Sequence, residues 1–212
     1  MAPVLGYFGT RGKAQMIRNL LVYKNIDFED RRLPFGGPPD YACTQWQAEK
    51  FSHGLTFPNL PYYIDGDFKL TQSLAILRYL GRKHDLAGRN EDEVTQLDFL
   101  EQQVLDLLSE MTKATLSSDV EVARKIHETL IGKELKPWDD FLRGRAWALG
   151  DRLTYVDFML YEALDWIRDT KPDEFKRFPT LVKFLDKFEE LPNIKQYMAS
   201  DKYKKRPFLR RK

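Results

Sequence analysis

The sequence predicts an α/β domain followed by an all-helical domain. Short runs of β-type residues alternate with helical periodicity as far as His84, whereas no strand signal of any length follows residue 90. The 212 residues suffice for one large or two small domains, and 42% hydrophobic residues are enough for a core. We therefore expect residues 1–84 to form the first domain, residues 85–90 a linker and residues 91–212 the second domain.

The first domain is expected to have the order β-α-β-loop-ββ-α. Gly6, inside the first β-type run VLGYF, indicates a close approach of another stretch of backbone. Asp65 and Gly66 are expected to form the two-residue turn of a hairpin. The expected elements are a strand at 4–8, a helix at 13–24, a strand at 28–33, a loop at 35–40, a short helix at 44–51, strands at 61–64 and 68–71, and a helix at 73–84.

The second half shows only helical periodicity. Asn90 and Glu93 are spaced as a capping pair, and Thr154 and Asp157 repeat that spacing. Asp157 could be a catalytic acid, but a helix cap is the more common role for this pattern, and we interpret it as a cap. The expected long helices cover 97–111, 156–167 and 181–191.

Composition argues against several classes of function. Outside residues 202–212 the chain holds 27 basic against 32 acidic groups, whereas a nucleic-acid-binding domain shows a basic face. We expect no secretory signal and no membrane span, because no apolar run approaches about 18 residues. The three histidines lack metal-ligand spacing, and no phosphate-binding loop or serine-nucleophile motif is present. A single cysteine, Cys43, fits a reducing compartment, so we expect a cytoplasmic protein.

Basic groups concentrate at the C-terminus. Residues 202–212, KYKKRPFLRRK, carry seven basic groups and no acidic one. Such a segment can contact anionic lipid or act as a targeting address, but a solvated terminus is more common. We therefore expect this basic tail to be solvated.

The stretch FPNLPYYI at 57–64 raises the question of a specific site. Pro61 lacks an N–H and does not suit the interior of a central strand, although it can begin one, and an X-Pro bond is readily cis. One interpretation is a surface turn that leads into the hairpin. The other is a fixed backbone edge that pairs with a ligand.

Longer stretches carry a resemblance to a known family. They are LGYF at 5–8, PDYACTQWQAEKF at 39–51, GLTFPNLPYYIDGDFKLTQSLAILRYL at 54–80, LEQQVLD at 100–106 and LGDRLTYVDFMLYEAL at 149–164. Together they span nearly the whole chain, which resembles a cytosolic glutathione S-transferase, most of all the mu class. The resemblance implies a thioredoxin-like N-terminal domain, an all-helical C-terminal domain, a homodimer, and no cofactor beyond glutathione as co-substrate.

The resemblance also implies a glutathione site in the first domain. In this family the proline of the NLP stretch is cis, so that Leu60 pairs with the cysteinyl backbone of glutathione as an added strand. Gln72 and Ser73 would hold the γ-glutamyl carboxylate, where the start of a helix favours an anion, although Ser73 alone is more typical of a cap. The other residues assigned to glutathione are Phe8, Trp46, Lys50, Asn59 and Pro61; without the resemblance, Trp46 would be packing and Lys50 solvated surface.

Tyr7 is the catalytic residue that the resemblance implies. Its hydroxyl would donate a hydrogen bond to the glutathione sulfur and favour the thiolate. Without the resemblance, a tyrosine at the end of a strand would be interpreted as core packing. The same comparison places Asp106 against the glutathione of the partner subunit, and Phe57 and Arg78 at the interface of a two-fold dimer. Taken alone, Asp106 would belong to a solvated helix face.

A pocket for hydrophobic electrophiles is implied at Phe8, Thr10, Lys13, Leu116 and Leu209. The chain departs from the mu pattern at Phe8, Lys13, Cys43 and Leu116, where that class has Trp, an apolar residue, Arg and Tyr. Because Leu116 cannot donate a hydrogen bond, we expect weaker activity with epoxides and enones than with aryl halides. Cys43 would either form a mixed disulfide with glutathione or be an unreactive loop thiol, the more common case.

Two functions from different classes follow. One is an enzyme that conjugates glutathione to hydrophobic electrophiles for detoxification. The other is a non-catalytic carrier of apolar ligands on the same fold. Tyr7 favours the enzyme, because a carrier has no need of a hydroxyl directed at sulfur.

Overall fold

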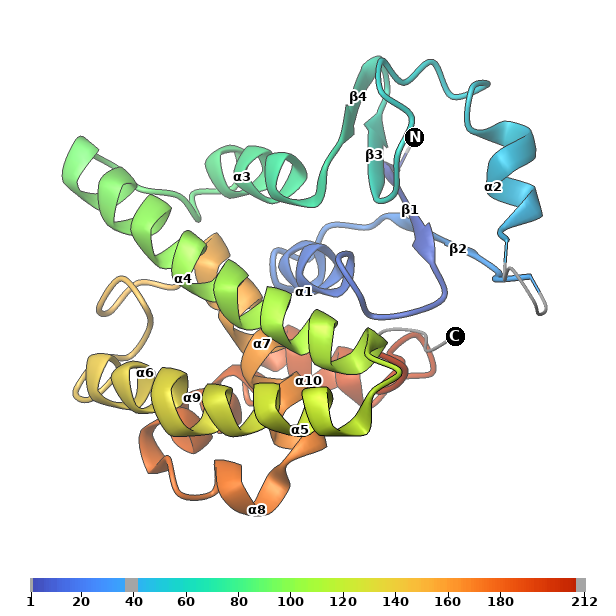
Figure 1. The fold of residues 1–212 in the computed structure, drawn as a ribbon. Coiled ribbons are helices and arrows are strands. Elements are labelled where there is room, and N and C mark those ends of the chain that lie inside the picture. The colour runs from blue at the N-terminus through green and yellow to red at the C-terminus, as the bar shows by residue number, and fades with distance from the viewer. Residues whose placement is uncertain (1, 37–41, 209–212) are drawn as a thin grey trace.

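A computed structural model describes residues 2–36 and 42–208 of the chain. Its elements are, in order, β1 (Val4–Phe8), α1 (Gln15–Tyr23), β2 (Glu29–Leu33), α2 (Thr44–Glu49), β3 (Tyr62–Asp65), β4 (Phe68–Thr71), α3 (Ser73–Lys83), α4 (Glu91–Leu116), α5 (Val120–Thr129), the π-helical turn η1 (Leu130–Glu134), α6 (Leu135–Phe141), α7 (Tyr155–Thr170), α8 (Pro172–Phe175), α9 (Pro179–Glu189) and α10 (Pro192–Met198). Helices α1 to α3 lie around the strands, and the later helices gather on the far side of α1 (Figure 1).

The described strands form one mixed sheet in the order β2-β1-β3-β4. β1 runs parallel to β2 and antiparallel to β3, and β3 and β4 form the hairpin. A parallel pair needs a crossover connection, which α1 supplies between β1 and β2. After β4, β-type pairing in the described part of the chain is limited to an isolated bridge between Trp147 and Gly150. The predicted fold class, α/β followed by all-α, is confirmed.

Gly6 lets a tyrosine of the neighbouring strand lie across β1. Gly6 pairs with Tyr62, and a Cβ on Gly6 would lie 2.1 Å from Cζ of Tyr62. The contact predicted at this glycine is close, but the ring of Tyr62 makes it rather than a backbone. Successive strand residues face opposite sides of the sheet, so Tyr62 packs with Trp46 of α2 while Tyr63 joins the main core with α1 and α3.

The hairpin turn lies one residue later than the sequence predicts. Asp65 pairs with Phe68, so the two loop residues are Gly66 and Asp67 rather than Asp65 and Gly66. Gly66 has a φ of 60°, which suits the glycine at the first loop position of a type II′ turn. The prediction was wrong because Asp-Gly is typical of a type I′ turn with both residues in the loop.

Helix α7 is buried along most of its length and begins at a capping box. Residues 155–167 are all buried. The Asp157 carboxylate accepts hydrogen bonds from the backbone N–H of Thr154 at 2.8 Å and of Ala148 at 2.7 Å. The interpretation of Asp157 as a cap is confirmed.

Helix α4 has half of the predicted capping pair. Asn90 accepts a hydrogen bond from the backbone N–H of Glu93 at 2.9 Å. The Glu93 carboxylate accepts instead from the backbone N–H of Arg89, one residue earlier, at 2.8 Å. Two backbone N–H groups are therefore satisfied, as in a capping box. The difference is that Glu93 binds the N–H of Arg89 instead of the N–H of the cap residue Asn90.

One apolar core joins the sheet to the helical part. It extends from Leu5 in β1 to Ile194 in α10, and α1 packs against both α3 and α7. A second cluster lies on the other face of the sheet beneath α2, and consists of Leu33, Cys43, Trp46, Leu55 and Tyr62. Among the described helices, none is long and apolar enough to cross a membrane.

The C-terminal segment is docked, and the prediction of a solvated tail was wrong for its described part. The carbonyls of Pro207 and Phe208 accept hydrogen bonds from the backbone N–H groups of Arg11 at 3.0 Å and Gly12 at 2.7 Å. The Phe208 ring is buried and stacks on Trp166 with 5.6 Å between centroids. The basic side chains of this segment remain exposed. The prediction rested on their charge and overlooked the two aromatic rings, Tyr203 and Phe208, that pack this segment against the rest of the protein.

Candidate active site

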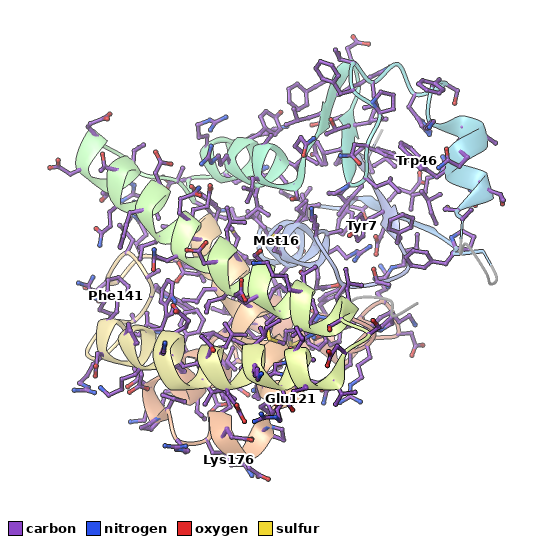
Figure 2. All side chains as sticks on the ribbon, in the orientation of Figure 1. Tyr7, Met16, Trp46, Glu121, Phe141 and Lys176 are labelled. Carbon is purple, nitrogen blue, oxygen red and sulfur yellow. The ribbon has the colours of Figure 1, made fainter. Side chains whose placement is uncertain are left out.

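A cavity of about 570 Å³ lies where the sheet, α1 and α3 meet the helical part. Figure 2 shows Tyr7 and Met16 near this junction, in the middle of the molecule, with Trp46 farther out towards α2. The described residues that line the cavity are Tyr7, Gly12, Lys13, Met16, Gln72, Ser73, Leu74, Leu105, Leu108, Ser109, Thr112, Lys113, Glu162, Trp166 and Phe208. The exposed surface of the wall is largely apolar, and polar residues come from the loop after β1, the start of α3, α4 and α7, as expected of a site for a small organic ligand.

Tyr7 lies near the end of β1 and is 6% exposed. Its hydroxyl accepts a hydrogen bond from the backbone N–H of Lys13 at 3.2 Å. Burial raises the pKa of Tyr7, opposed by the Lys13 N–H and by the charge of Arg18. The phenol therefore stays protonated at neutral pH. Because its oxygen accepts from the backbone, its own hydrogen can be donated into the cavity.

The loop after β1 brings the backbone close to that hydroxyl. Gly12 has a φ of 40°, and a Cβ there would lie 2.6 Å from the hydroxyl oxygen of Tyr7. Any larger residue would push the loop away and lengthen the bond from Lys13 to Tyr7. Glycine at this position is therefore required by the geometry of the site.

The start of α3 supplies the second polar feature of the cavity. Gln72 stands before the helix with a φ of 72° and makes no side-chain capping bond, and Ser73 is the first helical residue. The interpretation of Ser73 as a cap is therefore wrong. The first N–H groups of a helix have no partners within it and carry a partial positive charge, so this end of the cavity suits an anion.

A buried ion-pair network anchors the loop between β1 and α1. Arg11 is fully buried and donates to Glu162 at 2.9 and 3.1 Å and to Asp165 at 2.7 Å. Burial opposes the charge of Arg11, but the two carboxylates outweigh it and raise its pKa. Removing one partner of a buried pair typically costs about 3–5 kcal/mol. The network ties the loop that carries Lys13 to α7.

The C-terminal segment covers that network. The ring of Phe208 lies 3.8 Å from the guanidinium carbon of Arg11, a cation–π distance. The same ring lines the cavity. Phe208 therefore links the buried charges to the apolar wall.

Some sequence-predicted residues meet at the cavity and others lie beside it. Tyr7, Lys13, Gln72 and Ser73 line it. The residues predicted for the rest of glutathione lie outside the lining, toward α2 and the start of β3, and are Trp46, Lys50, Asn59, Leu60 and Pro61.

These residues outside the cavity lining make specific contacts of their own. Trp46 is buried and stacks on Tyr62 with 5.9 Å between centroids, and Lys50 lies 5.0 Å from the Phe51 ring centroid. The Leu60–Pro61 bond is cis. The Leu60 N–H donates to Oδ1 of Asn59 at 2.9 Å.

The predicted electrophile residues other than Lys13 are not in the described lining. Phe8 stacks on Phe35 at 4.4 Å between centroids, and Thr10 is buried with its carbonyl bound by Arg18 at 2.9 Å. Leu116 is 54% exposed at the end of α4. Leu209 lies outside the described residues.

The residues predicted for a dimer lie on the surface or in a polar contact. Phe57 is 77% exposed, and its carbonyl accepts a hydrogen bond from Thr71 at 3.0 Å. Arg78 donates to Glu101 at 2.8 Å. Asp106 is exposed on α4, beside the lining residue Leu105.

Several site residues were missed by sequence reasoning. The helical periodicity of α4 marked its apolar stripe but could not say that Leu105 and Leu108, at the edge of the core, also line a cavity. The partners Arg11 and Glu162 lie 151 positions apart, and each alone resembles an ordinary surface charge. No cluster of three or more potential metal ligands occurs in the described part of the chain.

Comparison with known proteins relates both parts of the chain to one family. Residues 3–82 match a family model described as the glutathione S-transferase N-terminal domain, and residues 105–201 match one described as the C-terminal domain. Glutathione S-transferase Mu 1 of Bos taurus is 45% identical over 203 residues, which cover 96% of this chain and 93% of the relative. Glutathione S-transferase Mu 3 of Mus musculus is 44% identical over 207 residues, covering 98% and 95%.

A solved structure agrees with the sequence matches. The crystal structure of the glutathione S-transferase Blo t 8 superposes with a TM-score of 0.86 at 36% identity, covering 98% of this chain and 96% of that one. The chain thus belongs to the glutathione S-transferase family. Within the family it is most similar to the mu class, and the resemblance read from the sequence is confirmed.

Proposed function

We propose that the protein joins the glutathione thiol to electrophiles with an apolar body and that Tyr7 stabilises the thiolate. The observation that carries the proposal is the Tyr7 hydroxyl at the cavity wall, held by the Lys13 N–H at 3.2 Å. Its raised pKa keeps the phenol protonated, so it is a hydrogen-bond donor at neutral pH. A sulfur placed in the cavity next to it would receive that hydrogen bond in its anionic form.

Glutathione would extend from the start of α3 towards α2. Its γ-glutamyl carboxylate fits the free N–H groups beside Gln72 and Ser73. Its cysteinyl backbone would pair with Leu60, whose N–H is released when the Asn59 side chain turns away. Trp46, Lys50 and Asn59 remain for the glycyl end, with the charge of Lys50 available to its carboxylate.

The electrophile would lie against the apolar wall, opposite sulfur. The thiol loses its proton to water, and the thiolate forms a C–S bond as the leaving group departs with its bonding electron pair. Leu105, Leu108 and Phe208 offer the apolar contact that holds an aromatic electrophile near sulfur. Placing the two reactants together supplies more of the rate than ionisation does, because effective molarities are large.

We also propose a homodimer in the cytoplasm. Phe57 supports the dimer, because a ring exposed to this extent is typical of an anchor that fills a pocket on a partner. Asp106 would then reach the glutathione amine of the partner subunit, and Arg78 would lie at the interface. The single cysteine suits a reducing compartment.

Steady-state conjugation tests the proposal. The purified protein is mixed with glutathione and chlorodinitrobenzene, and release of the aryl thioether is followed by absorbance. We expect saturation in both substrates. A protein that binds glutathione and apolar dyes but forms no thioether would be a carrier, and the proposal would be wrong.

A further inference from the structure

Lys13 places a positive charge at the wall of the apolar cavity. Its backbone N–H is bonded to the Tyr7 hydroxyl, so its side chain begins beside the position proposed for sulfur. Lys13 is one of the residues that line the cavity, and it is exposed. Within the described residues, the ion pairs formed by lysine and arginine do not include Lys13.

The other charges of the cavity wall are already compensated. The Glu162 carboxylate accepts hydrogen bonds from Arg11 at 2.9 Å and from Asn19 at 3.1 Å. Lys113, across the cavity on α4, is paired with Glu110. Tyr7 is neutral. Lys13 is therefore the lining residue whose charge has no counterpart among the described groups.

We propose that Lys13 makes the protein selective for electrophiles that carry an anionic group, a carboxylate or sulfonate, on an apolar body. The apolar wall would hold the body of such a molecule, and the Lys13 amine would pair with its acid group. An oppositely charged partner lowers the free energy of the bound state by a modest amount at an exposed site. This inference rests on the proposed conjugation of glutathione in the same cavity.

Lys13 could act instead on the thiolate, and the two roles have different consequences. A charge that stabilises the thiolate alters the rate with every electrophile by the same factor. A charge that pairs with the electrophile alters the rate only for those that carry an acid group. The ratio of kcat/KM for an acid to kcat/KM for its uncharged ester therefore isolates the second role.

A chlorodinitrobenzoate and its methyl ester make a matched pair of substrates. In both, the thiolate forms a C–S bond to the ring carbon and chloride leaves with the electron pair of the C–Cl bond. The acid group takes no part in bond making or breaking. The ester activates the ring more strongly than the carboxylate does, but this electronic difference is the same for every variant and cancels when their acid-to-ester ratios are compared.

The test compares the acid-to-ester ratio in the full-length wild type and in Lys13→Leu, Lys13→Gln and Lys13→Arg. We expect the ratio to fall about two- to fivefold in the Leu and Gln variants, the range of an exposed ion pair, and to be retained in the Arg variant. Added salt should lower the ratio in the wild type and have a smaller effect in Lys13→Leu. Lys125→Leu, which removes an exposed lysine of α5 outside the cavity lining, should leave the ratio unchanged.

Three outcomes would overturn the inference. Unchanged rates with both the acid and the ester in Lys13→Leu and Lys13→Gln would show that the charge acts on neither the electrophile nor the thiolate. An equal loss with acid and ester would assign Lys13 to the thiolate. Failure of the wild type to conjugate the acid, the ester and chlorodinitrobenzene alike would refute the proposed function itself, which is a distinguishable result.

Discussion

Replacing Tyr7 by phenylalanine removes one hydroxyl and leaves the ring that packs at the end of β1. Two hydrogen bonds are affected. The Lys13 N–H loses its acceptor at 3.2 Å, which should lower the free energy of unfolding by about 0.5–1.5 kcal/mol. The proposed bond from the hydroxyl to sulfur is also lost, and it belongs to the charge-assisted class worth about 1.5–3 kcal/mol.

The second loss sets the size of the kinetic effect. At 1.36 kcal/mol per pKa unit, it corresponds to roughly one to two units in the pKa of the bound thiol. A thiol with a pKa near 8.5 is about 3% ionised at pH 7, and one with a pKa two units lower is about 75% ionised. Nucleophilicity falls with pKa at a slope of roughly 0.4–0.5, which cancels about eightfold of this roughly twenty-five-fold gain. The net loss in Tyr7→Phe at pH 7 should therefore be only about threefold.

The pH dependence of kcat/KM for chlorodinitrobenzene shows the effect more clearly than one rate. Well below both pKa values, kcat/KM of Tyr7→Phe should be about tenfold lower than that of the wild type. The ionised fraction of the thiol differs by about a hundredfold there, and the higher nucleophilicity of the more basic thiolate cancels about eightfold of it. Above the higher pKa both thiols are ionised, and the lag should vanish or reverse. The midpoint of the profile should move upward by about one to two pH units.

Tyr62→Phe is a matched control on the adjacent strand. The Tyr62 hydroxyl is buried and has no hydrogen-bond partner among the described residues. Its removal should leave the midpoint of the profile unchanged. If Tyr7→Phe gave the wild-type midpoint, or if it lagged by the same factor at every pH, Tyr7 would not be the donor that stabilises the thiolate.

Three further predictions concern the dimer, the helix cap and the cysteine. Phe57→Ala should shift the dimer towards monomer in sedimentation and weaken glutathione binding measured by calorimetry; a variant unchanged in both would remove Phe57 from the interface. Burial raises the pKa of Asp157 to about 6, above its value of about 3.9 in an unfolded chain, so its contribution to stability is present at low pH and lost as the pH rises through 6. The free energy of unfolding of the wild type, relative to Asp157→Asn, should therefore fall by about 2–3 kcal/mol between pH 4 and 7 in urea titrations, and a pH-independent difference would contradict this. Cys43 is buried in the cluster beneath α2, so mass spectrometry should find no glutathione adduct on the native protein and one adduct after denaturation in urea; rapid modification of the native protein would show that the thiol is accessible.

Local signals account for the parts of the fold that the sequence predicted. The capping box at Thr154 and Asp157 needs only residues three apart, and Gly6 marks a close approach because no side chain fits across from Tyr62. The hairpin turn was misplaced by one residue because two turn types accept Asp and Gly at different positions. Short-range chemistry thus places elements well and fixes their ends less well.

The remaining parts of the site depend on contacts between distant residues. Arg11 is bound by Glu162 and by the ring of Phe208, and neither partner can be inferred from its own neighbourhood in the sequence. A charged side chain is typically exposed, so the burial of Arg11 contradicts the usual expectation for its residue type. The docking of the basic tail follows from the same contacts and was missed for the same reason.

The geometry of bound glutathione tests the central claim most directly. A crystal structure of the protein with glutathione should place the sulfur within hydrogen-bonding distance of the Tyr7 hydroxyl and the γ-glutamyl carboxylate at the start of α3. The Leu60 N–H should have exchanged Asn59 for the peptide backbone of the ligand. A glutathione bound elsewhere, or bound here with its sulfur turned away from Tyr7, would contradict the account.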